Sequence, residues 1–100
     1  MSAYFILNQD LDAPQRYLEE YVPQAMAIAT RHGAELIAFD AQAEALEGSP
    51  SACVVVLRFP DREAVHAFLD DPEYQPAKAL RYAITSNNHA MLAPSFPPPG

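Results

Sequence analysis

Short apolar runs alternate with amphipathic stretches along the chain, and the pattern predicts a small domain of mixed strands and helices. The runs 3–8 (AYFILN) and 53–59 (CVVVLRF) are apolar on both alternating faces, as in strands that are covered on both sides. Residues 35–39 (ELIAF) predict a second strand, and residues 86–92 predict a final, weaker one. A turn at 48–50 (GSP) precedes the 53–59 strand, which we expect in the middle of the sheet.

Between the first two predicted strands, apolar residues recur at helical spacing and predict an amphipathic helix that packs on a sheet. Asp12 and Gln15 resemble a capping box at its start, and Gly33 marks its end. Pro23 lies inside this stretch and removes one backbone donor. We therefore expect a kink or a break near Tyr21.

Two further helices are predicted after the 53–59 strand. Asp61 is a candidate N-cap for the first of them, whose core stripe is Ala64, Val65, Phe68 and Leu69. Asp71 and Pro72 restart a helix by the same rules, with a cap followed by a proline in the first turn. The apolar side of this last helix is predicted to consist of Tyr74, Ala77, Leu80 and Ala83.

The order β α β β α β is typical of the α+β ferredoxin-like fold, an antiparallel sheet with helices on one face. We expect a domain at 1–93, a proline-rich and flexible tail at 94–100, and the first and third strands side by side and parallel at the centre. The Ala-rich segment 40–47 either continues the second strand after a bulge or, as we prefer, turns outward as an arm.

Composition changes this picture in one respect, because half of the residues are apolar and only 19% are charged. A two-layer domain of 100 residues cannot easily hide that much apolar surface. The sheet face without helices is still apolar, whichever alternating set of the first strand it carries. We therefore expect a homodimer in which two sheets pair face to face.

Charge and motifs exclude several classes of function. Thirteen acidic residues against six basic ones give a net charge of −7, which argues against nucleic-acid and membrane-surface partners. The single Cys53 has no disulfide mate, and the N-terminus has no signal pattern, so the expected location is cytoplasmic. No glycine-rich phosphate loop is present, and the three histidines lack metal-ligand spacing, so no cofactor and no metal is expected.

Several short motifs carry a resemblance to a known family: EALEG at 44–48, VVVLRFP at 54–60, PEY at 72–74 and AKALR at 77–81. Together they resemble the family of the domain of unknown function 1330, in the dimeric α+β barrel superfamily. The resemblance implies a ferredoxin-like subunit that pairs sheet to sheet, with a cavity in each half of the barrel. The chain departs from the family at 39–41 (FDA), where an arginine and two glycines are common, which argues against anion binding by that loop.

Two polar residues on the central strands are the first candidates for ligand binding. In a parallel central pair, Asn8 and Arg58 would lie at the same end of the sheet and converge on the mouth of an apolar pocket. The alternative for Arg58 is an ion pair with Glu35 on the neighbouring strand.

Tyr74 and Arg81 are the second pair of candidates, because seven residues place them on one face of a helix. A guanidinium beside a phenol can orient a carboxylate or an enolate. In the alternative interpretation Tyr74 packs in the core while Arg81 caps carbonyls or pairs with Glu47. His89 and Tyr74 are the only candidates for handling a proton, and a solvated histidine is the alternative for His89.

Three functions remain open from the sequence. One is a cofactor-independent enzyme of the monooxygenase or isomerase kind, acting on a small organic molecule, neutral or anionic, by analogy with other dimeric α+β barrels. The second is a non-catalytic structural or regulatory dimer whose barrel interior is filled by side chains. The third is a subunit whose acidic surface meets a basic partner protein.

Overall fold

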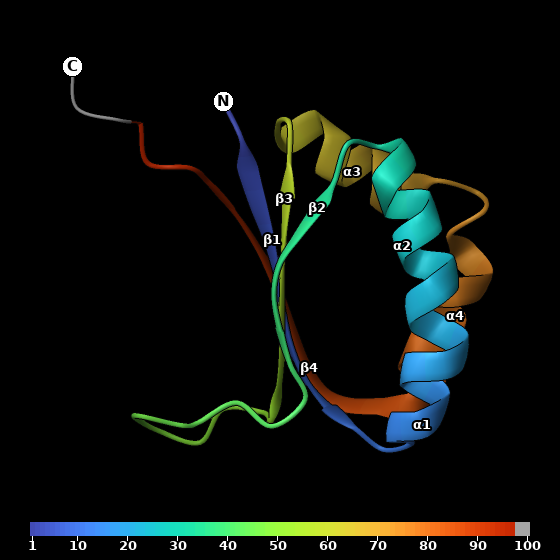
Figure 1. The fold of residues 1–100 in the computed structure, drawn as a ribbon, viewed down its shortest axis with the longest axis vertical. Helices are drawn as coiled ribbons and strands as arrows, with labels where there is room; N and C mark the ends of the chain where they lie inside the picture. The colour runs from blue at the N-terminus through green and yellow to red at the C-terminus, as the bar shows by residue number, and fades with distance from the viewer. Residues whose placement is uncertain (98–100) are drawn as a thin grey trace.

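The computed structural model describes residues 1–97, in which a four-stranded antiparallel sheet is covered on one face by helices (Figure 1). The strand order is β2-β3-β1-β4, the arrangement of the predicted ferredoxin-like α+β fold. The elements are β1 (Ala3–Leu11), α1 (Pro14–Arg16), the π-helical turn η1 (Tyr17–Tyr21), α2 (Val22–Arg31), β2 (Glu35–Asp40), β3 (Cys53–Phe59), α3 (Arg62–Asp70), α4 (Gln75–Ile84) and β4 (Thr85–Pro94).

Strands β1 and β3 are neighbours at the centre of the sheet, as predicted, but they are antiparallel and the predicted parallel pairing is wrong. Tyr4 lies opposite Arg58, and Asn8 lies opposite Val54. The reason is topological: the helical crossover makes β2 run parallel to β1, and the following loop reverses the chain once more before β3. Strand β3 therefore lies between two strands that both run opposite to it.

The alternation along β1 and β3 separates two faces of the sheet. The helix-facing set is buried and consists of Ala3, Phe5, Leu7, Gln9, Cys53, Val55, Leu57 and Phe59. The opposite set is only half-buried within the subunit and consists of Tyr4, Ile6, Asn8, Val54, Val56 and Arg58. We call this second side the open face; β4 contributes His89 opposite Asn8 and Met91 opposite Ile6.

The first helical segment is irregular at the predicted place, because a π-helical turn precedes the proline. The N–H of Val22 bonds to the carbonyl of Tyr17, five residues back, and α2 then begins with Pro23 in its first turn. The predicted capping box at Asp12 is wrong: the N-cap residue is Ala13, with no side-chain cap, and the Asp12 carboxylate instead accepts a hydrogen bond from Ser86 at 2.8 Å.

Helix α3 is capped by Asp61 as predicted, whereas α4 begins later than predicted. The Asp61 carboxylate accepts the backbone N–H of Ala64 at 2.8 Å. Residues 72–74 form a turn instead of a first helical turn, and α4 starts at Gln75 with a second proline, Pro76, in its first turn. The buried side of this segment is Tyr74, Ala77, Arg81 and Ile84, so Ala83, predicted to be on it, is exposed.

The loop between β2 and β3 is the predicted arm. It points away from the helices, on the side of the open face, and so do residues 95–97 after β4 (Figure 1). Strand β4 continues to Pro94, two residues beyond the predicted end, and Ser95 then bonds to Ser2 through their backbones. Residues 98–100 of the predicted tail lie outside the described residues.

In the described part of the chain, no helix combines the length and the apolar character needed to cross a membrane.

Gly33 is the glycine whose replacement should cost most stability. It ends α2 with a φ of +84°, and a Cβ there would lie 2.6 Å from Cγ of Pro60. We expect Gly33→Ala to lower the free energy of unfolding by about 2 to 3 kcal/mol, combining left-handed strain with the clash. Gly48 has a similar φ of +71° with open space around it, so Gly48→Ala should cost about 1 kcal/mol. Urea unfolding measures both, and equal losses would contradict the role of Pro60.

Candidate functional site

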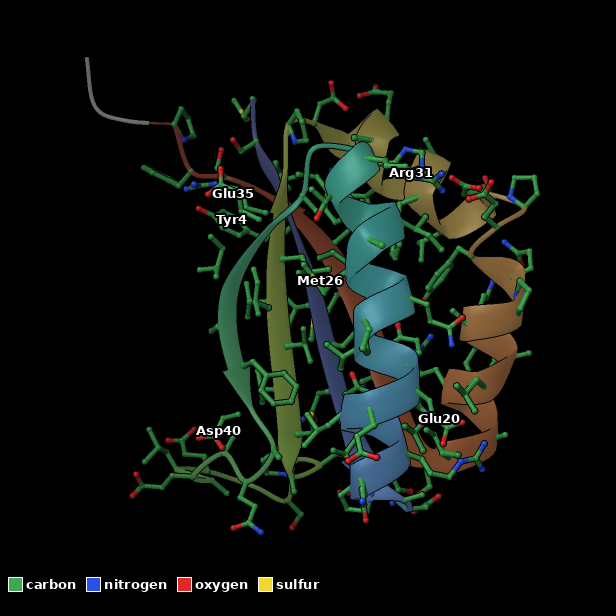
Figure 2. The ribbon with its side chains drawn as sticks, turned by 45° about the vertical axis from the view of Figure 1, so that its right-hand side comes forward. Tyr4, Glu20, Met26, Arg31, Glu35 and Asp40 are labelled. Atoms are coloured by element: carbon green, nitrogen blue, oxygen red, sulfur yellow. The ribbon has the colours of Figure 1, made fainter. Side chains whose placement is uncertain are left out.

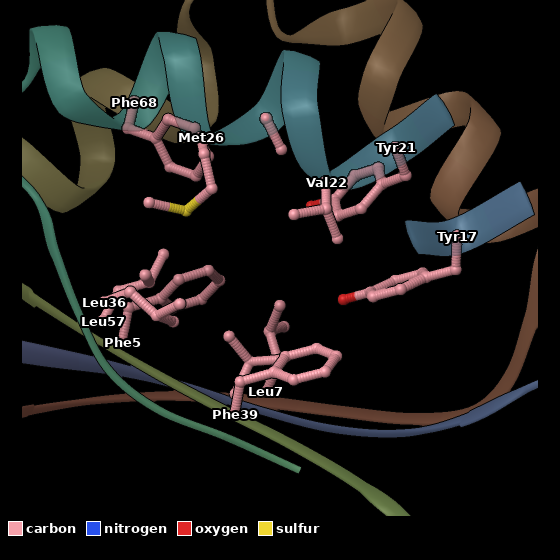
Figure 3. Close-up of a pocket in the computed structure, with 12 residues that line it drawn as sticks. Phe5, Leu7, Tyr17, Tyr21, Val22, Met26, Leu36, Phe39, Leu57 and Phe68 are labelled. Atoms are coloured by element: carbon pink, nitrogen blue, oxygen red, sulfur yellow. The ribbon is translucent and has the colours of Figure 1, made fainter. Parts of the chain in front are cut away.

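An apolar cavity of about 40 Å³ lies between the sheet and α2, on the helix-covered side of the subunit (Figure 3). Its lining is Phe5, Leu7, Tyr17, Tyr21, Val22, Ala25, Met26, Leu36, Phe39, Val55, Leu57 and Phe68. Val22 and Met26 of α2 are only partly buried, and Leu36 and Phe39 of β2 are exposed. The outer side of the cavity is therefore formed by the edge strand β2 and by α2, which lie beside each other in Figure 2.

Two tyrosines from the π-helical turn line one end of this cavity. The rings of Tyr17 and Tyr21 stack with centroids 4.9 Å apart, and Phe39 stacks on Tyr17 at 6.4 Å. In a regular helix, residues four apart already share a face. The π turn contains one residue more than a regular helical turn and lies just before Pro23. Both tyrosines are buried, and the helix continues past the proline.

A buried polar network lies behind the tyrosines. The side-chain amide of Gln9 donates to the Tyr17 hydroxyl at 2.8 Å, and Arg81 donates to the Gln9 carbonyl oxygen at 3.2 Å. The hydroxyls of Tyr21 and Tyr74 are 2.8 Å apart. The network joins β1, the π turn and α4 at one end of the cavity.

Arg81 is the charged centre of this network. Its side chain is only 4% exposed, and within residues 1–97 it forms no ion pair with a carboxylate and its Nε has no hydrogen-bond partner. The guanidinium carbon lies 4.7 Å from the ring centroid of Tyr82. Burial lowers the pKa of Arg81, but the neighbouring phenols of Tyr74 and Tyr21 raise it on balance, so the group remains a cation.

The two phenols at the cavity remain protonated at physiological pH. Burial is the largest cause that raises the pKa of Tyr17, and it raises the pKa of Tyr21 further still. Both groups can therefore form neutral hydrogen bonds but cannot serve as bases. No carboxylate or imidazole is among the residues that line the cavity.

The structure brings together only some of the residues predicted from the sequence. Tyr74 and Arg81 share one buried face of the same helical segment and belong to one network. Sequence reasoning missed Gln9 and did not propose Tyr17 or Tyr21 as site residues. One signal was available: residue 9 continues the buried alternation of residues 3, 5 and 7, so a polar side chain there had to be buried.

The predicted convergence of Asn8 and Arg58 is wrong, because antiparallel pairing places them at opposite ends of the sheet. The Asn8 amide holds the start of β3, donating to the carbonyls of Ser51 and Cys53 at 2.8 and 3.0 Å and accepting from the backbone of Ser51. Arg58 pairs with Glu35 at 2.7 Å, the alternative considered above. His89 lies on the open face, away from the cavity, and is exposed.

Among residues 1–97, no group of three or more His, Cys, Asp or Glu side chains could hold a metal ion.

The model of a protein family described as Domain of unknown function (DUF1330) matches residues 2–94 of the chain. A comparison with curated proteins finds no match.

Solved structures with the same fold are found at low sequence identity. A protein of unknown function from Rhodopseudomonas palustris is 15% identical with a TM-score of 0.80, covering 97% of this chain and 84% of the other. SnoaB, a cofactor-independent oxygenase from Streptomyces nogalater, is 14% identical with a TM-score of 0.72, over 97% and 95% of the two chains. A dimeric ferredoxin-like protein of unknown function from Thermobifida fusca is 14% identical with a TM-score of 0.57, over 95% and 92%. At these identities the likeness shows the fold.

Asn8 and Arg58 should differ in their contributions to stability. We expect Asn8→Ala to lower the free energy of unfolding by about 2 kcal/mol, because backbone groups at the start of β3 lose three part-buried hydrogen bonds. Arg58→Ala removes one exposed ion pair and should cost less than about 1 kcal/mol. Denaturant titration of both variants tests this, and a greater loss for Arg58→Ala would refute the assignment.

Proposed function

The chain belongs to the family of the domain of unknown function DUF1330. For this member of the family we propose that each subunit binds a small, mainly apolar organic molecule in the cavity between the sheet and α2. The observation that carries the proposal is an apolar cavity that ends at two buried phenols, with a buried guanidinium behind them. Apolar walls with a few convergent polar groups are the usual composition of a small-molecule site. The buried Arg81 supports the same conclusion. A buried cation that has no carboxylate partner within residues 1–97 lowers the stability of the fold, so its presence beside the cavity indicates a role in binding.

The size of the cavity requires its outer wall to move when a ring-sized ligand enters. About 40 Å³ is less than the roughly 150 Å³ of an engineered cavity that holds benzene. Met26 is flexible, and Leu36 and Phe39 are 48% and 38% exposed on the edge strand β2. Strand β2 also has a register shift between Leu36 and Ala38. This wall is the least constrained side of the cavity.

Cofactor-independent chemistry on the bound molecule is the second candidate. The fold of SnoaB, described as a cofactor-independent oxygenase, supports it by analogy. Because the cavity lining has phenols and no base, the protein would contribute orientation and hydrogen-bond donation, with any proton going to solvent. The polar side chains Asn8 and Arg58 on the open face form no comparable site, since both are engaged in structural contacts.

We further propose that the chain forms a homodimer through the open face. Tyr4, Ile6, Val54 and Val56 present a half-buried apolar surface there, and Met91 beside them is 57% exposed. The arm and residues 95–97 both extend on this side of the sheet (Figure 1). The ferredoxin-like protein from Thermobifida fusca is described as dimeric, which supports the same pairing. The alternative function, a non-catalytic structural or regulatory dimer, keeps this pairing but has no ligand.

Filling the cavity should weaken ligand binding. Acetophenone is the probe, since it joins one aromatic ring to one small polar group. Ala25 lines the cavity and Ala27 is exposed on the same helix, so Ala25→Met and Ala27→Met form a matched pair. We expect Ala25→Met to weaken binding about tenfold or more, because the added side chain occupies the space, while Ala27→Met binds as the wild type does. Ligand-observed NMR titration measures both, and no binding by the wild type would overturn the proposed function.

A charge on the open face should disrupt the dimer. Met91→Asp places an unpaired carboxylate in an apolar contact, and we expect the dissociation constant to rise about tenfold or more. Leu18→Asp is the control, because Leu18 is 47% exposed on the helical side of the subunit. Sedimentation velocity gives the oligomeric state, with circular dichroism to verify folding. A wild type that is monomeric at micromolar concentration contradicts the homodimer.

A further inference from the structure

The buried network at the cavity has a defined hydrogen-bond direction, because Arg81 can only donate. A guanidinium carries five N–H groups and no acceptor, so the side-chain group of Gln9 that faces Arg81 at 3.2 Å must be its carbonyl oxygen. The amide nitrogen of Gln9 then faces the Tyr17 hydroxyl at 2.8 Å. The orientation of a glutamine amide is usually ambiguous, but here the arginine decides it.

It follows that the hydroxyl oxygen of Tyr17 accepts a hydrogen bond from Gln9, and that the hydroxyl proton of Tyr17 points away from Gln9. Within residues 1–97 the Tyr17 hydroxyl has no further hydrogen-bond partner. The side chain is 1% exposed, so bulk water does not reach it freely. Figure 3 shows the hydroxyl at the end of the ring that points into the space among Val22, Leu7 and Phe39. Within residues 1–97 the Tyr17 hydroxyl is therefore a buried donor at the cavity without an acceptor.

A water molecule is a poor acceptor for this proton. A buried water needs two to four polar partners, and in this cavity the other lining side chains are apolar apart from Tyr21, whose hydroxyl is engaged with Tyr74. An organic oxygen with an apolar body satisfies the donor and fills the apolar walls together. The positive charge of Arg81 is two hydrogen bonds away and favours an acceptor with negative charge.

We infer that the cavity selects molecules with a carbonyl-type acceptor oxygen, and that the chain Arg81–Gln9–Tyr17 sets this specificity by holding the Tyr17 hydroxyl as a donor. The inference rests on the proposed function and specifies its ligand class: an aryl or alkyl ketone, or the enolate derived from one. Tyr17 touches the ligand. Gln9 and Arg81 are positioning residues, because they act through Tyr17.

The test compares two probes that differ in one atom group. Acetophenone has a carbonyl oxygen where α-methylstyrene has a methylene, and both have the same ring and methyl group. Wild-type protein should bind acetophenone about tenfold more tightly, because only the ketone accepts the Tyr17 proton. Equal affinities would overturn the inference and leave the proposed function intact, whereas binding of neither probe would overturn the proposed function itself.

Gln9→Glu reverses the hydrogen-bond direction with almost no change of shape. A carboxylate accepts from Arg81 and from Tyr17, so the Tyr17 proton is drawn away from the cavity. We expect the variant to lose the preference for acetophenone over α-methylstyrene. Tyr17→Phe should give the same loss of preference, and it decides the outcome if Gln9→Glu does not fold. A variant that folds and keeps the tenfold preference would contradict the role of the chain Arg81–Gln9–Tyr17 in setting the specificity.

Discussion

The guanidinium of Arg81 is the group around which the polar interior of this subunit is arranged. A cation that is 4% exposed and has no carboxylate partner within residues 1–97 must be compensated by neutral oxygens. The carbonyl of Gln9 and, at 3.5 Å, that of Asn88 provide this. The Thr85 hydroxyl donates to the backbone carbonyl of Arg81 and lies 3.1 Å from the side-chain oxygen of Asn88, which joins the end of α4 to the start of β4.

The helix-covered face of the sheet carries the cavity, whereas the open face is the surface proposed for association. Because all the helices lie on one side, the buried network and the cavity are formed within one subunit (Figure 1). The open face retains side chains that contribute little to the core, including the structural Asn8 and the paired Arg58. A change on the open face can therefore alter association without reaching the cavity, and mutations in the two places should combine additively.

Periodicity predicted the element order and the buried strands because the apolar pattern of this chain is strong, with β1 and β3 apolar on both faces. It could not give strand direction, and the wrong parallel pairing moved Arg58 to the wrong end of the sheet. It also placed the start of α4 at the first proline, since Pro72 and Pro76 both satisfy the same rule. The site was predicted in part: helical spacing joins Tyr74 to Arg81, whereas the contact of Gln9 with Tyr17 depends on the relative placement of a strand and a helix.

The raised pKa values of the cavity phenols have a consequence for how the subunit would respond to its surroundings. Arg81 remains charged, Tyr17 and Tyr21 remain neutral, and the Gln9 amide does not ionise between mildly acidic and mildly alkaline conditions. The recognition groups then present the same pattern of charge and donors at every physiological pH. Any dependence of binding on acidity would belong to the bound molecule, so a pH titration of affinity would report the ionisation of the ligand and thereby help to identify it.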